Sequence, residues 1–184
     1  MLGSHSMVRD ILLWPHPMLA QCAAAVGAVD VAVQTLIRDL FDTMYDAPGV
    51  GLAAPQVGVP LQVLVLDTRA RQPESQPLAM VNPHIVERFG TTPYKEGCLS
   101  IPGESEEVER AERVSVEYLD AQGVPQRLVC EGLLAIAVQH ETDHLVGKVY
   151  LDYLSPLTRV LIRQRMRRRK REWAKAPAQL GEAL

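Results

Sequence analysis

The sequence is poor in cysteine and lacks any hydrophobic run long enough to cross a bilayer. Its three cysteines are Cys22, Cys98 and Cys130. An odd, sparse set in a domain of this size argues against a disulfide framework and indicates a reducing compartment. The start also lacks the basic-then-apolar layout of a signal peptide. We therefore expect a cytoplasmic protein with no membrane partner, in which at least one thiol remains for other chemistry.

The chain has no internal repeat and no low-complexity domain, and its 184 residues suit one domain with a substantial core. Its content of 47% hydrophobic and 22% charged residues is typical of a globular protein. Residues 1–6 resemble an expression scar, so Met7 is the expected natural start. We expect the folded domain to cover residues 7–174 and a flexible tail to cover 175–184.

Hydrophobic periodicity predicts the order of the elements. Apolar residues spaced three and four apart predict a helix from Asp30 to about Tyr45. Further predictions are strands over 61–66, 78–81 and 85–89, a hairpin over 114–130, a helix over 131–146 and a last helix from Ser155-Pro156. Together they indicate a single α+β domain, with mixed or antiparallel strands around a central metal-binding helix and a C-terminal helix.

Residues 140–144 read His-Glu-Thr-Asp-His within a predicted helix. Positions four apart on a helix share a face, with Cβ atoms about 5–6 Å apart. His140 and His144 can therefore coordinate one metal ion, and the Glu141 carboxylate can reach the coordination position of the metal that remains open. The alternative is a solvated helix face with two ordinary histidines.

A catalytic site of this kind needs a third protein ligand. In one peptidase class a third histidine follows, but Tyr150 occupies its place here. A second class uses a downstream glutamate, for which only Glu172 and Glu182 are available, and both are poorly placed. A thiolate remains. Cys98, in Glu-Gly-Cys-Leu-Ser, is the best of the three because the preceding glycine lets the backbone approach a ligand. Cys22 and Cys130 are better explained as packed apolar residues.

A third segment, residues 49–56, reads Gly-Val-Gly-Leu-Ala-Ala-Pro-Gln. Its glycines and alanines indicate a closely approached backbone. Gln56 supplies an amide that can donate to an oxyanion. Alone, this segment is a weak signal, because a Gly/Ala-rich turn after a helix is usually only a turn.

Together the three segments resemble peptide deformylase, whose motifs G-x-G-L-A-A-x-Q, E-G-C-L-S and H-E-x-D-H occur here in order. The resemblance runs from about Met7 to the C-terminal helix. It implies a metal-dependent hydrolase that removes the N-formyl group from the N-terminal methionine of new polypeptides and releases formate, as in the bacterial cytoplasm. It also implies one divalent metal ion, usually ferrous iron, with zinc, nickel or cobalt as substitutes.

The resemblance assigns roles to residues of this chain. It implies Cys98, His140 and His144 as metal ligands and Glu141 as general acid and base. It implies Gln56 and the backbone N–H of Leu99 as donors to the oxyanion.

Helix geometry adds an apolar floor. Leu133, Ile136 and Ala137 lie seven, four and three residues before His140 and share its face. The floor suits an unbranched apolar side chain such as methionine, although the same residues could simply pack the core. The resemblance places the substrate methionine there, with Val50, Gly51 and Glu96 nearby.

Two departures from the family pattern concern charge. Pro48 stands where some relatives carry an acid, so we expect Arg110 to have a different partner. Residues 103–109, expected to be a loop, contain four glutamates. Their charge either repels acidic peptide substrates or only reflects a solvent-exposed loop.

The C-terminal segment 159–175 contains nine arginines and lysines and one acidic residue, although the whole chain has a net charge of −3. This asymmetry indicates a separate partner. By resemblance to bacterial deformylases we expect ribosome contact, and no DNA partner. We expect Leu157, Val160, Leu161 and Gln164 to begin the inward face of this helix.

Two other functions remain as alternatives at this stage. One is an H-E-x-x-H metallopeptidase, which needs a histidine or glutamate as third ligand. The other is a nucleic-acid-binding module with a structural Cys/His metal site, which would need four ligands and would leave Glu141 without a purpose.

Overall fold

The computed structural model describes residues 7–47 and 49–173. The elements in chain order are η1 (Pro17–Ala20), α1 (Val31–Asp46), β1 (Gly51–Ala53), η2 (Ala54–Val57), β2 (Val63–Leu66), β3 (Leu78–Phe89), β4 (Thr92–Gly97), β5 (Ser105–Arg110), β6 (Arg113–Leu119), β7 (Pro125–Glu131), α2 (Gly132–Leu145), η3 (Tyr150–Tyr153) and α3 (Pro156–Trp173). The expected scar, tail and Pro48 lie outside the described residues. No helix within these ranges is long and apolar enough to cross a membrane.

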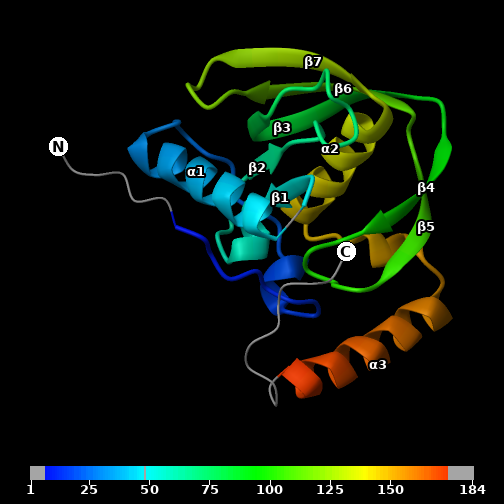
Figure 1. Cartoon of the computed structure of the whole chain (residues 1–184). Coiled ribbons are helices and arrows are strands. Elements are labelled where there is room, and N and C mark those ends of the chain that lie inside the picture. Colours follow the sequence, from blue (N-terminus) through cyan, green and yellow to red (C-terminus); the bar gives the residue numbers. More distant parts are fainter. Residues whose placement is uncertain (1–6, 48, 174–184) are drawn as a thin grey trace.

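Two antiparallel sheets make up the β structure, which confirms the α+β prediction. The larger sheet has the order β1-β2-β3-β6-β7, and β4 pairs with β5 in a separate two-stranded sheet. In Figure 1 the larger sheet curves over α2, while β4 and β5 run down one side toward α3.

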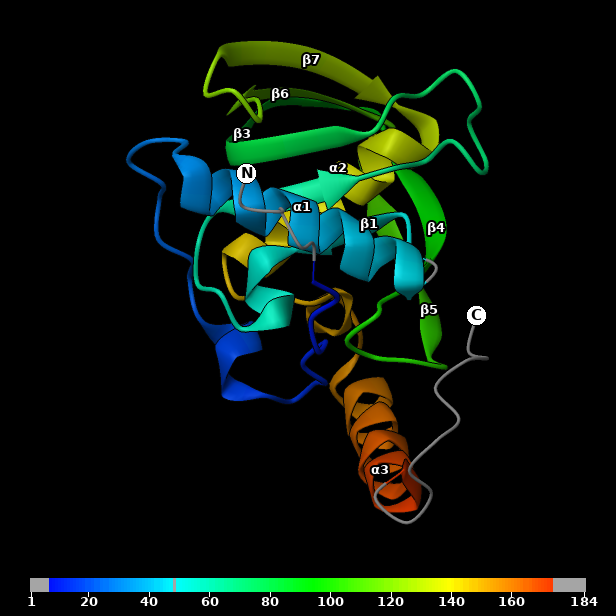
Figure 2. The ribbon, with the colours of Figure 1, turned by 60° about the vertical axis from the view of Figure 1, so that its left-hand side comes forward.

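Strand β2 is buried on both faces. Leu64 and Leu66 pack in a cluster with α2, whereas Val63 and Val65 pack in a cluster with α1. Because successive side chains of a strand point to opposite faces, this division places α1 and α2 on opposite sides of the sheet. Figure 2 shows α1 in front of β1 and α2 behind it. Helix α2 is therefore an interior element with a fixed position.

Helix α1 begins where the sequence predicts. The Asp30 side chain accepts a hydrogen bond from the backbone N–H of Val33 at 2.9 Å, which caps the helix. Leu40 and Met44 on its inner face are fully buried. The helix holds one side of the sheet and makes no contribution to the cleft described below.

Four strands, β1, β3, β4 and β5, differ from the predictions. The two short strands expected around Asn82 are one strand, β3, with a register shift between Val81 and His84. Asn82 has a φ of 50°, and its side chain bonds the backbone N–H and C=O of Val26, each at 2.8 Å. The shift is a β-bulge that accommodates Pro83 and keeps both halves of the strand in the sheet. Strands β1 and β4 were not predicted, and β5 lies where a loop was expected over 103–109.

The predicted inward stripe of α3 is wrong. Leu157 is 70% exposed, and Val160 and Leu161 are 49% and 45% exposed. The buried residues are Ile162 and Met166, which pack on Ile101 and η3. They lie four residues apart and so share one face. Tertiary contacts, rather than the first apolar residues of the helix, set which face turns inward.

Candidate metal centre and active site

Three side chains offer metal-binding atoms at one point. Cys98 directly follows β4, and His140 and His144 lie on α2. Their donor atoms all lie within 4.8 Å of one another, and the Cys98 Sγ is 3.3 Å from His144 Nε2. A thiolate and two imidazoles are a donor set suited to zinc or iron. The arrangement brings together the three predicted ligands from two distant parts of the chain.

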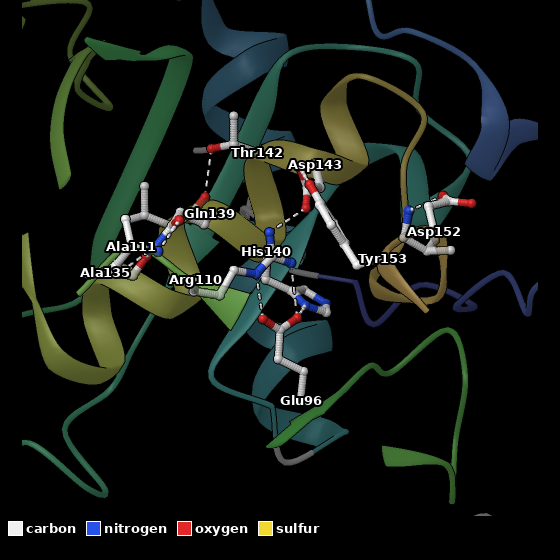
Figure 3. A network of polar contacts seen from close by, with 12 residues as sticks. Glu96, Arg110, Ala111, Ala135, Gln139, His140, Thr142, Asp143, Asp152 and Tyr153 are labelled. Carbon is white, nitrogen blue, oxygen red and sulfur yellow. Dashed lines mark hydrogen bonds and ion pairs between the residues drawn. The ribbon is translucent and has the colours of Figure 1, made fainter. Parts of the chain in front are cut away.

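The surroundings prepare both imidazoles for a metal. The His140 Nδ1 lies 2.7 Å from the Glu96 Oε2, so the carboxylate fixes Nδ1 as the protonated nitrogen and leaves Nε2 for the metal (Figure 3). Burial and the nearby His140 lower the pKa of His144, which favours the neutral form that a ligand requires. The residues present therefore fit a bound cation.

Glu96 is itself held by Arg110. The Arg110 Nε and Nη2 donate to the two Glu96 oxygens at 2.5 and 3.0 Å, and Nη1 donates to Asp143 at 2.7 Å (Figure 3). Tyr153 donates to the other Asp143 oxygen at 3.0 Å, and its ring lies 4.7 Å from the guanidinium. Arg110 thus has Glu96 and Asp143 as its partners, and this buried chain of charges fixes the orientation of His140.

Glu141 points into the site with a capacity for proton transfer. Its side chain is buried, and its Oε2 has no hydrogen-bond partner among the described atoms. Burial raises the pKa of the carboxyl to about 7. A Cβ on Gly51 would lie 2.5 Å from the Glu141 Oε1, so glycine at this position leaves room for the carboxylate.

Gln56 reaches the same point from η2. Its Oε1 accepts from the Ala53 N–H at 2.8 Å, which turns the amide nitrogen toward Ser100 Oγ at 3.2 Å and Cys98 Sγ at 3.6 Å. A side-chain N–H group thus lies beside the metal donors. Leu99 lines the same cleft.

A cleft of about 940 Å³ opens onto these residues. Leu133, Ile136 and Ala137 line it from α2, as the helix spacing predicts. It also contains the other predicted site residues except His144, which lies in the metal-binding group: Val50, Gly51, Gln56, Glu96, Cys98, Leu99, His140 and Glu141. The apolar floor therefore lines the same cleft as the polar candidate residues.

The acidic segment forms a strand where a loop was expected. Residues 105–110 form β5, and Glu104, just before it, is only 8% exposed. Arg165 contacts Glu104 at 2.7 Å and Arg169 contacts it at 3.5 Å, so its charge is compensated. Glu104, the glutamate of this segment that lines the cleft, is thus already paired with arginine.

Sequence reasoning missed the support given by Asp143, Gln139 and Tyr150. Gln139 bonds both the N–H and the C=O of Ala111, which ties α2 to the end of β5. The Tyr150 ring centroid lies 6.3 Å from that of His140. Asp143 lies three residues after His140, a spacing that could have pointed to a shared helix face.

The rejected ligand candidates lie elsewhere. Cys130 is fully buried in the sheet core, and burial raises its thiol pKa to about 12. The expectation that Cys22 is a packed apolar residue is wrong, because its side chain is exposed and contacts the Val146 carbonyl. The Glu172 carboxylate pairs with Arg168 on α3. None of these belongs to the metal-binding group.

Known proteins are similar to this chain in sequence and fold. The sequence pattern of the polypeptide deformylase family matches residues 8–160. Peptide deformylase from Alkalilimnicola ehrlichii is 48% identical over 165 residues, which cover 90% of this chain and 92% of that protein. The crystal structure of a peptide deformylase from Legionella pneumophila is 46% identical with a TM-score of 0.87, covering 93% of this chain and 100% of that one. A Met-Ala-Ser-bound class I type b peptide deformylase from Acinetobacter baumannii is 36% identical with a TM-score of 0.77, covering 82% and 100%.

The matched residues include every element that contributes to the cleft. They give no support to a metallopeptidase, and of the residues that the structure describes they leave out Met7 and the part of α3 after residue 160. The chain belongs to the polypeptide deformylase family, the metal-dependent hydrolases that remove the formyl group from the N-termini of newly made polypeptides.

Proposed function

We propose that this deformylase uses Cys98, His140 and His144 to hold one divalent cation and Glu141 to move the protons of the reaction. The observation that carries the proposal is the convergence of the three donors beside a buried carboxylate in a cleft with an apolar floor. When bound, the cation would act as a Lewis acid toward the formyl oxygen and the attacking water.

The chain's own residues account for the remaining steps. Glu141 accepts a proton from the attacking water and then gives it to the departing α-amine, so formate and a free N-terminus result. The Gln56 amide and the Leu99 N–H donate to the oxyanion of the tetrahedral intermediate. The Ala53–Gln56 hydrogen bond holds that amide in place before substrate arrives.

The substrate methionine occupies the apolar floor in this proposal. Leu133, Ile136 and Ala137 offer the side chain an apolar surface next to His140, and Val50, Gly51 and Glu96 line the cleft close by. The Acinetobacter baumannii relative with bound Met-Ala-Ser supports a methionine-led peptide as the ligand of the same cleft.

Formate release from a formyl-methionyl peptide tests the proposal. The metal-loaded protein should release formate, and the acetylated peptide should be a much poorer substrate. Cys98→Ala should lose metal together with activity, whereas Cys130→Ala, in the sheet core, should retain both. Cleavage of an internal peptide bond without formate release would instead identify a metallopeptidase.

Ferrous iron is the native metal in our proposal, with zinc, nickel or cobalt as substitutes. A thiolate-ligated ferrous site open to a cleft is sensitive to oxygen. The iron form should therefore lose activity in air faster than the nickel or cobalt form. The same comparison in Cys22→Ser shows whether oxidation of the exposed Cys22 thiol contributes to the loss of activity. Equal decay of all metal forms would contradict an oxidisable metal site.

The basic face of α3 is the proposed ribosome contact, which would place the enzyme in the cytoplasm where formylated N-termini emerge. Its exposed residues include Arg163, Arg167, Arg168, Lys170 and Arg171. Contacts with RNA phosphates weaken as salt increases. Co-sedimentation with ribosomes at several salt concentrations should show weaker binding and a smaller salt slope for Arg167→Gln/Arg168→Gln/Arg171→Gln. Unchanged binding would make the basic face a solubilising surface only.

A further inference from the structure

Helix α3 is attached to one wall of the catalytic cleft. The wall is residues 101–105, all of which line the cleft. Arg165 of α3 donates from Nε to the Glu104 Oε2 at 2.8 Å, and its Nη2 lies 2.7 Å from the same oxygen. Because the Glu104 side chain is only 6% exposed, this two-point contact holds a buried carboxylate.

Arg169, one helical turn later, holds the backbone of the same wall. Its guanidinium donates to the Pro102 carbonyl and, at 3.2 Å, to the Gly103 carbonyl. Gly103 has a φ of +71°, and a Cβ there would collide with the Arg169 guanidinium, whose Cζ lies 2.7 Å from the Cβ position. Glycine at 103 thus permits both the turn and the close approach of the arginine.

Apolar packing joins the same two segments. Ile162 and Met166 lie on the face of α3 that carries Arg165 and Arg169, and they pack in one cluster with Ile101. Cys98 is packed against this cluster. Helix α3 therefore packs against the segment that runs from Cys98 to the wall, and its position helps to fix that segment.

The wall and the α2 floor line the same cleft from different segments of the chain, and the parts of the substrate assigned to them here rest on the proposed function. Leu133 and Ile136 supply the surface for the first side chain, and His140 and Glu141 surround the formyl group. The wall of residues 101–105 is left for the peptide beyond the first residue. We propose that Arg165 and Arg169 are positioning residues that hold this wall and so determine the affinity for the peptide portion that follows formyl-methionine.

Kinetics with two substrates test this proposal. In Arg165→Gln/Arg169→Gln, the KM for a formyl-Met-Ala-Ser-led hexapeptide should increase by at least about threefold, as expected for the loss of coupled polar contacts. The kcat for that substrate, and both constants for formyl-methionine amide, should stay near the parent values. Arg165→Lys, which keeps a charge near Glu104, should recover part of the hexapeptide KM.

A double-mutant cycle shows whether the contact itself matters. Glu104→Gln and Arg165→Gln should have non-additive effects on the hexapeptide KM, because either change removes the same contact. The matched control is Glu87→Gln/Arg127→Gln, which removes an exposed ion pair of 3.3 Å between β3 and β7. This control should change neither constant.

Three outcomes would overturn the proposal: an unchanged hexapeptide KM, an equal change for both substrates, or additive effects in the cycle. If Glu104→Gln fails to fold, the partly exposed Arg165 variants still decide the question. Absence of formate release from the parent protein would count against the proposed function and not against the wall.

Discussion

The Glu96 carboxylate contacts the His140 imidazole at 2.7 Å while the Arg110 guanidinium grips the same carboxylate from the other side. All three side chains are at most 10% exposed. The Glu96–His140 contact therefore lies in a poorly solvated environment, where the carboxylate strongly favours the His140 tautomer that is protonated on Nδ1. The readiness of the site for metal depends on a residue that is not itself a ligand.

Glu96→Gln should weaken metal binding without removing a ligand. The amide keeps the shape of the side chain but loses the charge that orients His140, and Kd for the metal should increase about 10- to 100-fold. Competition with a chelator measures this change. Glu117→Gln, on the exposed side of β6, is the control. An unchanged Kd would show that His140 needs no carboxylate.

Gly51→Ala should reduce kcat and leave metal content intact. The added Cβ would lie 2.5 Å from the Glu141 Oε1, so the carboxylate must move. Displacement of a catalytic group by a fraction of an ångström to an ångström lowers rates by about 100-fold. Gly27→Ala, where the Cβ meets nothing within 4 Å, should have little effect. Equal activity of both variants would reject the assigned role of Gly51.

Glu141→Ala should bind metal and yet lose turnover by about 100- to 10,000-fold, the usual contribution of a general acid or base. Metal analysis and formate release on the same sample separate the two properties. A metal-loaded variant with wild-type kcat would exclude Glu141 from proton transfer.

Asp67 should make stability depend on pH at low pH. The Arg69 guanidinium, which donates to Asp67, lowers the pKa of that carboxyl from 3.8 to about 2. A lowered pKa gives stability that is complete above the unfolded-state pKa and is lost as pH falls through the folded-state value. Because the Arg69 side chain is 50% exposed, the contribution should not exceed about 1 kcal/mol. Denaturant unfolding of wild type and Asp67→Asn should differ at pH 6 and converge near pH 2.

The closeness of His140 and His144 could be predicted because the H-E-x-x-H spacing is a local property of a helix. The same holds for Leu133, Ile136 and Ala137. The partners of Arg110 could not be predicted, because Glu96 and Asp143 reach it through tertiary folding from 14 and 33 residues away. These contacts carry no periodic signal in the sequence.

Strands β4 and β5 escaped prediction because their composition is unlike that of a strand. The segment 105–110 contains three glutamates and an arginine, residues with low strand propensity. Cross-strand pairing explains how they fit, since Lys95 lies opposite Glu107 and Tyr94 lies opposite Val108. The inward face of α3 was wrongly predicted for a related reason: apolar residues occur on two of its faces, and only packing on Ile101 distinguishes them.

The metal donors come from two elements that are distant in sequence, the end of β4 and the middle of α2. A cation held by Cys98, His140 and His144 would close a chain loop of more than forty residues, much as a disulfide does. The ion would bind the folded chain far better than the unfolded one, so the melting temperature would rise with its free concentration. In a cell, metal supply would then set not only how fast this enzyme works but also how long each molecule survives proteolysis.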